Sequence, residues 1–163
     1  MFGMFKKKRT MKDDNIGQVI AASVSASIMA ALADGAFSEE ERERLVETVG
    51  AYKAGHMSPQ EILAMIEMHV SAISKAGRGE WPGLMHQLAA GFSDESKKIV
   101  LHAAGNMALV DGKLELSERE FLGNLANWIE VDQALLREWL GEFESTIQDG
   151  LANGFLSPDY VRD

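Results

Sequence analysis

One twelve-residue motif occurs twice in this chain, at residues 34–45 and 111–122. Both copies read D-G-x-[FL]-x-x-x-E-R-E-x-L without a gap, and we call this pattern the acidic-turn motif. Each copy closes a long apolar stretch, Ile16 to Ala33 or Ile99 to Val110, and opens a charged amphipathic stretch. Such self-similarity indicates that a helix-turn-helix unit has been duplicated. We therefore expect a fold assembled from two related halves.

Capping residues, apolar residues at helical spacing and glycine stops predict seven helices. They cover about 15–33, from Ser38 to Gly55, from Ser58 to Gly77, a short segment with Leu84, Leu88 and Phe92, from Ser93 or Asp94 to Val110, about 117–130, and from near Asp132 to Leu151. No segment alternates with a period of two, so the predicted fold class is all-α with about seven helices in two pseudo-symmetric halves.

The expected organisation is one domain between two termini of different character. A basic, flexible arm covers residues 1–14, the helical domain covers 15–153, and a tail covers 154–163. Within the domain, a loop at 77–82 separates the halves 15–76 and 84–153. All three tryptophans are expected first in the core: Trp128 and Trp139 fall on apolar stripes, and a contact with a partner is an alternative only for Trp81, in this loop.

Charge is distributed unevenly along the chain. The first 12 residues contain five basic side chains and no acid, whereas residues 13–163 carry 11 basic and 25 acidic ones, a net charge of −14. An acidic body repels phosphate backbones and attracts cations or basic proteins, so we expect a protein partner and no nucleic acid. The basic arm, with Phe2, Met4 and Phe5, offers only weak contact with a membrane surface.

Several chemistries are disfavoured by the sequence. The chain has no cysteine, which excludes disulfides and thiolate chemistry and is compatible with a cytoplasmic location. Asp13 and Asp14 interrupt the basic flank before the apolar stretch 16–33, and one glutamine and three serines dilute the stretch itself, which argues against a signal peptide or a membrane span. The zinc-protease, serine-hydrolase and phosphate-loop motifs are absent, and none of the four histidines has a glutamate three residues before it. We predict a protein that is not an enzyme; a metal-dependent hydrolase is the weakest alternative.

The acids of the motif allow two interpretations. Asp34 and Asp111 follow the end of a helix, where the macrodipole makes a carboxylate unfavourable by about 0.3–1 kcal/mol. Glu41 and Glu118 lie in the first turn of the next helix, where a carboxylate is favoured, and Glu41 also completes a capping box with Ser38. A divalent cation held by Asp34, Glu41, Asp111 and Glu118 would offset the unfavourable interaction of the two aspartates with the helix dipoles. The alternative is that all four acids are helix caps and solvated charge.

The second half of a calcium EF-hand loop has a similar pattern, but its first half is missing here. The positions four and two residues before the aspartate hold Ala30 and Leu32 in the first copy and Met107 and Leu109 in the second, where an EF-hand has oxygen ligands. One copy therefore does not wrap an ion alone, and ligands must converge from both copies or from elsewhere. Oxygen ligands without sulfur suit calcium, magnesium or manganese.

An acidic chain of seven predicted helices with two such turns resembles the TerB family, the tellurite-resistance and DjlA-type helical domain. The resemblance extends over about 15–151 and leaves the arm and the tail unexplained. It implies an all-helical fold with an acidic centre that binds a divalent metal, a place in tellurite and other stress resistance, and no established catalysis. On this sequence the motif acids are Asp34, Glu41, Asp111 and Glu118. The second copy departs from the family pattern in having Val110 where an alanine precedes the aspartate.

Overall fold

The protein folds into seven α-helices, as a computed structural model describes for residues 14–33, 35–52, 57–110 and 116–153. The described residues contain no strand, so the predicted all-α class is confirmed. The helices are α1 (Ile16–Ala33), α2 (Glu39–Tyr52), α3 (Pro59–Ala76), α4 (Trp81–Leu88), α5 (Asp94–Ala108), α6 (Leu116–Trp128) and α7 (Gln133–Ala152), with a 3₁₀ turn, η3 (Arg78–Glu80), before α4.

Side-chain caps start several helices where the sequence predicts them. The hydroxyls of Ser58 and Ser93 and the carboxylate of Asp132 accept hydrogen bonds from backbone N–H groups of the first turns of α3, α5 and α7. Each bond satisfies one of the N–H groups that a helix start leaves without an intrahelical partner. The starts of α3, α5 and α7 that were predicted from capping residues are therefore confirmed.

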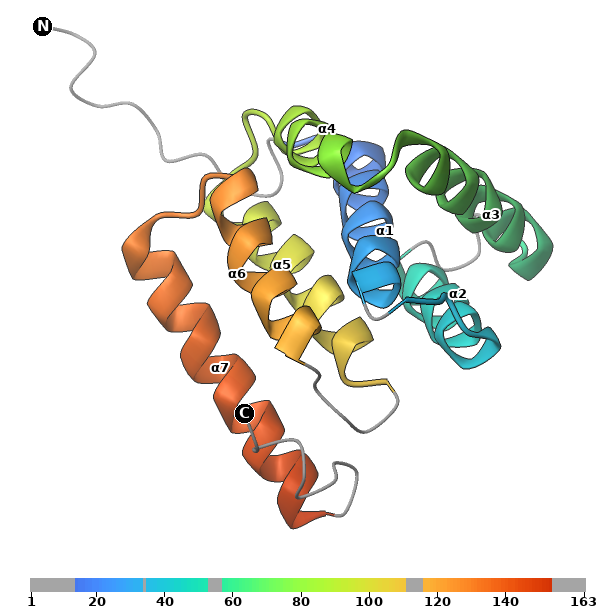
Figure 1. Cartoon of the computed structure of the whole chain (residues 1–163). Coiled ribbons are helices and arrows are strands. Elements are labelled where there is room, and N and C mark those ends of the chain that lie inside the picture. The colour runs from blue at the N-terminus through green and yellow to red at the C-terminus, as the bar shows by residue number, and fades with distance from the viewer. Residues whose placement is uncertain (1–13, 34, 53–56, 111–115, 154–163) are drawn as a thin grey trace, which may run out of the picture.

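The two helices that precede the acidic-turn motifs, α1 and α5, form the centre of the fold. They pack against each other more extensively than any other pair of helices. Figure 1 shows them side by side, running in the same direction. At their starts, Asp14 Oδ2 accepts hydrogen bonds from Ser93 N (2.9 Å), Ser93 Oγ (2.8 Å) and Ser96 Oγ (2.7 Å). This contact aligns the two N-terminal ends.

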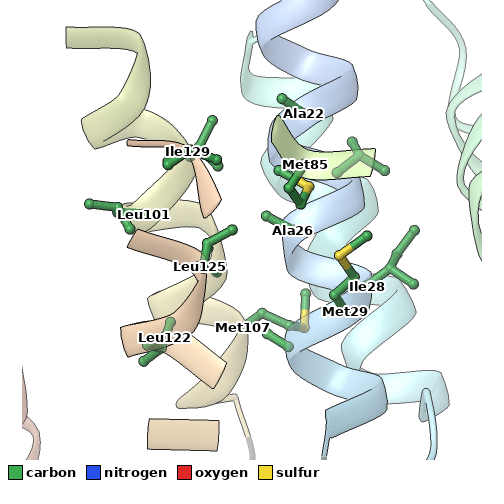
Figure 2. Packing of buried hydrophobic residues seen from close by; sticks show 14 of the residues in the cluster. Ala22, Ala26, Ile28, Met29, Met85, Leu101, Met107, Leu122, Leu125 and Ile129 are labelled. Carbon is green, nitrogen blue, oxygen red and sulfur yellow. The ribbon is translucent and has the colours of Figure 1, made fainter. Parts of the chain in front are cut away.

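Five other helices pack on α1, namely α2 to α6, so it is buried on nearly all sides rather than on one stripe. Figure 2 shows how Ala22, Ala26 and Met29 of α1 face Leu125 of α6 and Met107 of α5. Among the described helices, α1 is the one long and apolar enough to cross a membrane, with a mean hydropathy of 1.8, and 67% of it is buried inside the fold. Its apolar character is accounted for by its place in the core.

Two details differ from the sequence-based expectations, and one alternative left open by the sequence is decided. Residues 77–82 are not a loop, because η3 and the first turn of α4 begin inside them and Pro82 occupies the start of a helix. Trp81 is 5% exposed and packs edge-on against Phe121, so its expected place in the core is confirmed and the alternative of a partner contact is not. Helix α5 ends at Ala108, two residues before Val110.

That the two halves of the domain are related by pseudo-symmetry stays a prediction. Residues 1–13 of the predicted arm and the whole predicted tail, 154–163, lie outside the described residues. Asp14, the last residue of the predicted arm, is described and is hydrogen-bonded to Ser93 at the start of α5.

Candidate functional site

The described helices that flank the two acidic-turn motifs meet at one end of the molecule. Because α1 and α5 run in parallel, their C-terminal ends lie together, and α2 and α6 start from that end (Figure 1). Helix α2 begins at Glu39 and α6 at Leu116, each five residues after the aspartate of its motif. Glu41 and Glu118 therefore lie in the first turns of two helices that start at one end of the fold.

The first copy of the motif is held by a capping box. Glu41 Oε1 accepts a hydrogen bond from Ser38 N (2.8 Å), and Ser38 Oγ accepts one from Glu41 N (3.2 Å). This is the reciprocal pair predicted from the spacing of serine and glutamate. The capping role of Glu41 is therefore confirmed, and one of its two carboxylate oxygens is already engaged.

Arg42 and Phe37, two further residues of the first copy, contact each other. The guanidinium of Arg42 lies over the ring of Phe37, 4.9 Å from its centroid, and its Nη1 donates to Phe37 O (3.4 Å). Arg42 Nε also donates to Glu67 Oε1 of α3 (2.6 Å). The arginine and the aromatic residue of the motif thus have a structural use, which the sequence analysis did not assign to them.

The remaining shared positions belong to the core. Leu45 and Leu122, the last residues of the two copies, are both buried. Ala30 and Met107, which replace the first EF-hand ligands, are buried as well. Neither copy can therefore be completed into an EF-hand by residues that precede it.

The two glutamates differ in their surroundings. Glu118 is 4% exposed, whereas Glu41 is half-buried. Glutamate is rarely buried to this degree unless it is paired, and Glu118 does have interaction partners. The two copies are alike in sequence and unlike in burial.

A basic side chain already lies at the end of α1. Arg78 Nη2 of η3 donates to Leu32 O in the last turn of α1 (2.6 Å), and the same guanidinium lies over Trp81. A cation near a helix C-terminus is favourable by about 0.3–1 kcal/mol. The dipole argument for a bound metal therefore weakens at the first turn, because Arg78 supplies positive charge there.

A cleft of about 530 Å³ lies between the first copy and the residue that precedes the second. Arg44, which belongs to the first copy, and Thr48 line it from α2, and Val110, which immediately precedes Asp111, lines it beyond α5. The other walls are formed by α5 and α7, and their lining residues are Asn106, Leu109, Thr146, Asp149, Gly150 and Asn153. The cleft combines the C-terminal ends of two helices with one acidic and one basic side chain.

The predicted ligands are only partly described. Asp34 and Asp111 lie outside the described residues, so the convergence of the four acids is a prediction that the structure leaves untested. Within the described part of the chain, no three acidic or histidine side chains group closely enough to hold a metal ion. Glu39, Glu40, Glu43 and Glu120 are all exposed, as expected for a solvated face.

The fold and the duplicated motif define an all-α domain in which a copy of the acidic-turn motif follows each of the two parallel central helices. The family model of tellurite resistance protein TerB matches residues 20–138, a range that includes both copies of the motif. The chain belongs to the TerB family, and the resemblance predicted from the motif is confirmed. No curated protein and no solved structure matches the chain.

Proposed function

We propose that this chain is a non-enzymatic, cytoplasmic stress-response domain that binds a divalent cation at the end where its two acidic turns begin. The proposed ligands are Asp34, Glu41, Asp111 and Glu118, and the proposed ion is calcium, manganese or magnesium. A role in tellurite resistance follows from the family and is part of the same proposal.

The observation that carries the proposal is the parallel packing of α1 and α5. It brings the described flanks of both motifs to one end, and Arg44 of the first copy lines the same cleft as Val110 beside the second. Since one copy lacks the ligands to hold an ion alone, a shared site requires such proximity. Glu41 would contribute its second carboxylate oxygen, because the first accepts from Ser38 N.

Thermal unfolding with added calcium, manganese or magnesium tests the site. An ion at a hundred times its dissociation constant adds ~2.7 kcal/mol, which raises Tm by about 5–10 °C for a protein of this size. Asp34→Asn combined with Asp111→Asn is expected to abolish the rise. The matched control is Glu43→Gln with Glu120→Gln, which removes two exposed acids of the same motif and leaves the rise intact. The site assignment fails if no ion raises Tm or if both pairs behave alike.

A second function, a metal-free acidic adaptor for a basic protein partner, is favoured by two contacts. The capping box of Ser38 and Glu41 and the contact of Arg78 with Leu32 O account for the first turn without an ion. In this case binding of the partner weakens as salt is added and does not respond to chelator. Loss of binding on adding chelator would instead assign the partner to the cation-bound form.

A further inference from the structure

A narrow apolar furrow runs between α2 and α5, with one face of α1 as its floor. Its walls include Leu45 and Val49 of α2 and Ile99 and Ala103 of α5. Figure 1 shows α1 between these two helices. The space left in the furrow is about 20 Å³, enough for one water molecule. Helix α2 packs principally on α3 and makes only minor contact with α5, so the walls can part without disturbing the packing of α1 on α5.

The furrow continues into the polar cleft of about 530 Å³. Thr48 of α2 lines both spaces. On α5, Ile99 and Ala103 line the furrow, and Asn106 on the same face of the helix lines the cleft. From Ile99 to Asn106 the helix rises about 10 Å. The furrow and the cleft therefore form one amphipathic site, apolar at one end and polar at the other.

The hydroxyl of Ser23 lies in the floor of the furrow. Ser23 is 9% exposed, and its Oγ has no hydrogen-bond partner among the described residues. Ser27, which also lines the furrow, donates instead to Ser23 O (2.8 Å). Since α1 and α5 run in parallel from the contact of Asp14 with Ser93, Ser23 lies at about the level of Ala103. A buried hydroxyl normally has a partner, and this one lies where the apolar part of the site gives way to the polar part.

The polar end of the site carries one charge of each sign. Arg44 of α2 and Asp149 of α7 both line the cleft, and within the described part of the chain neither forms an ion pair. The amides of Asn106 and Asn153 add uncharged donors and acceptors. A guanidinium suits a phosphate, and a carboxylate suits an ammonium group. A purely anionic group would be repelled by Asp149 and by the acidic body, so the cleft fits a zwitterionic group.

We propose that this site binds a single-chain phospholipid with a zwitterionic headgroup, of the lysophosphatidylethanolamine class. The phosphate lies at Arg44 and the ammonium group at Asp149. The ester carbonyl between headgroup and chain accepts the hydrogen bond that Ser23 Oγ has to give. The alkyl chain follows the furrow past Ile99 towards Ile16, which lines the furrow and is 44% exposed.

The width of the furrow favours an alkyl chain over a helix of a protein partner. A helix with its side chains is about 10–12 Å across, whereas the apolar part of the site has room for one water molecule. An alkyl chain needs the smallest parting of the walls among apolar ligands. An apolar lining with a few polar groups at one end is also the usual composition of a small-molecule site.

Equilibrium dialysis of the natural chain against lysophosphatidylethanolamine, below the concentration at which the lipid forms micelles and with chelator present, tests the proposal. We expect saturable binding of one lipid per chain. Two comparison ligands separate the parts of the site: glycerophosphoethanolamine has the headgroup without the chain, and a monoacylglycerol has the chain without the charges. Each is expected to bind at least about tenfold more weakly, because each loses interactions at one end.

Two variants with matched controls locate the binding. Arg44→Gln is expected to weaken lysophosphatidylethanolamine binding by about tenfold or more and to leave monoacylglycerol binding unchanged. Its control is Arg137→Gln, an exposed arginine near the other end of α7. Ala103→Leu fills the furrow and is expected to weaken binding of both lipids, whereas Ala64→Leu, on the exposed face of α3, changes neither. Arg44 is exposed, so its variant tests the site even if Ala103→Leu does not fold.

The proposal is overturned if no saturable binding occurs below the micellar concentration, if Arg44→Gln and Arg137→Gln bind alike, or if the headgroup alone or a free fatty acid binds as tightly as the lysophospholipid. This lipid site goes beyond the proposed cation site and does not depend on it. Asp34→Asn with Asp111→Asn is therefore expected to keep lipid binding. Loss of lipid binding with an intact cation-dependent rise in Tm would overturn the lipid site alone.

Discussion

The substitution Asp14→Ala tests what holds the two central helices in register. One carboxylate oxygen, Asp14 Oδ2, accepts three hydrogen bonds of 2.7–2.9 Å from the backbone and hydroxyl of Ser93 and the hydroxyl of Ser96. Both serines are buried at the start of α5. The carboxylate thus ties the residues before α1 to the first turn of α5, where negative charge is also favoured by the helix dipole.

The magnitude follows from the kind of bond that is lost. A hydrogen bond to a charged group contributes about 1.5–3 kcal/mol. The three bonds share one oxygen, and Ser93 Oγ still accepts from Ser96 N after the substitution, so the contributions do not add fully. We expect Asp14→Ala to lower the free energy of unfolding by about 3–4 kcal/mol. For a chain of this size, that corresponds to a fall in Tm on the order of 10 °C.

Urea and thermal unfolding measure the effect, with two comparison variants. Asp14→Asn keeps one acceptor oxygen without the charge, so its loss should be intermediate. Asp94→Asn removes a carboxylate from the same helix start without touching these three bonds, and should cost about 0.3–1 kcal/mol. If Asp14→Ala is no more destabilising than Asp94→Asn, the carboxylate does not tether α1 to α5 and the reasoning is wrong.

Two further substitutions probe how α7 is held on α5. Gly105→Ala is expected to destabilise by about 1–3 kcal/mol in thermal unfolding, because the added Cβ would lie 2.9 Å from Phe143 Cε2 and 3.1 Å from Trp139 Cζ2. Gly141→Ala is its control, since nothing lies within 4 Å there and alanine favours the helix. Lys98 Nζ donates to Glu138 Oε1 (2.9 Å) and Glu142 Oε1 (2.7 Å), and its hydrogen bond holds the pKa of Glu142 below the ordinary 4.5. Because the pKa of Glu142 is lowered in the folded protein, this carboxylate contributes stability above pH 4.5, and the contribution is lost as the pH falls through the folded-state pKa. Lys98→Met should therefore weaken the dependence of the free energy of unfolding on pH in acid. If that dependence is unchanged, this ion pair is not linked to unfolding. The same hydrogen bonds raise the pKa of Lys98 above 10.5, so its contribution is present below pH 10.5 and is lost only in stronger base.

Local sequence rules were sufficient for most helix starts and insufficient for the contacts between helices. Ser58, Ser93, Asp132 and the pair of Ser38 and Glu41 act within three residues of themselves, so spacing alone identifies them. Asp14 and Ser93 are 79 residues apart. No sequence periodicity relates positions so far apart. Asp14 follows a run of basic residues, so its sequence context predicts an exposed chain end rather than a buried contact.

Glycine and proline misled the interpretation of residues 77–82 for a physical reason. Gly77 ends α3 with a φ of +81°, as expected of a glycine stop. Pro82, however, lies at the first turn of α4, where the missing N–H has no intrahelical partner to lose. The same residue types mark a loop and a helix start, and the choice between them depends on burial of Trp81, which is a tertiary property.

The unequal surroundings of the two turns bear on how they could share an ion. At the first turn, Arg78 supplies a cation to the end of α1 and the capping box engages one oxygen of Glu41. At the second, Glu118 is buried, and Arg44 of the first copy reaches the cleft beside Val110. Two copies of one motif therefore have different electrostatic surroundings at their described residues, and we do not expect Asp34 and Asp111 to contribute equally. Replacing both aspartates together is therefore the appropriate test of the shared site, because the proposal needs ligands from both copies.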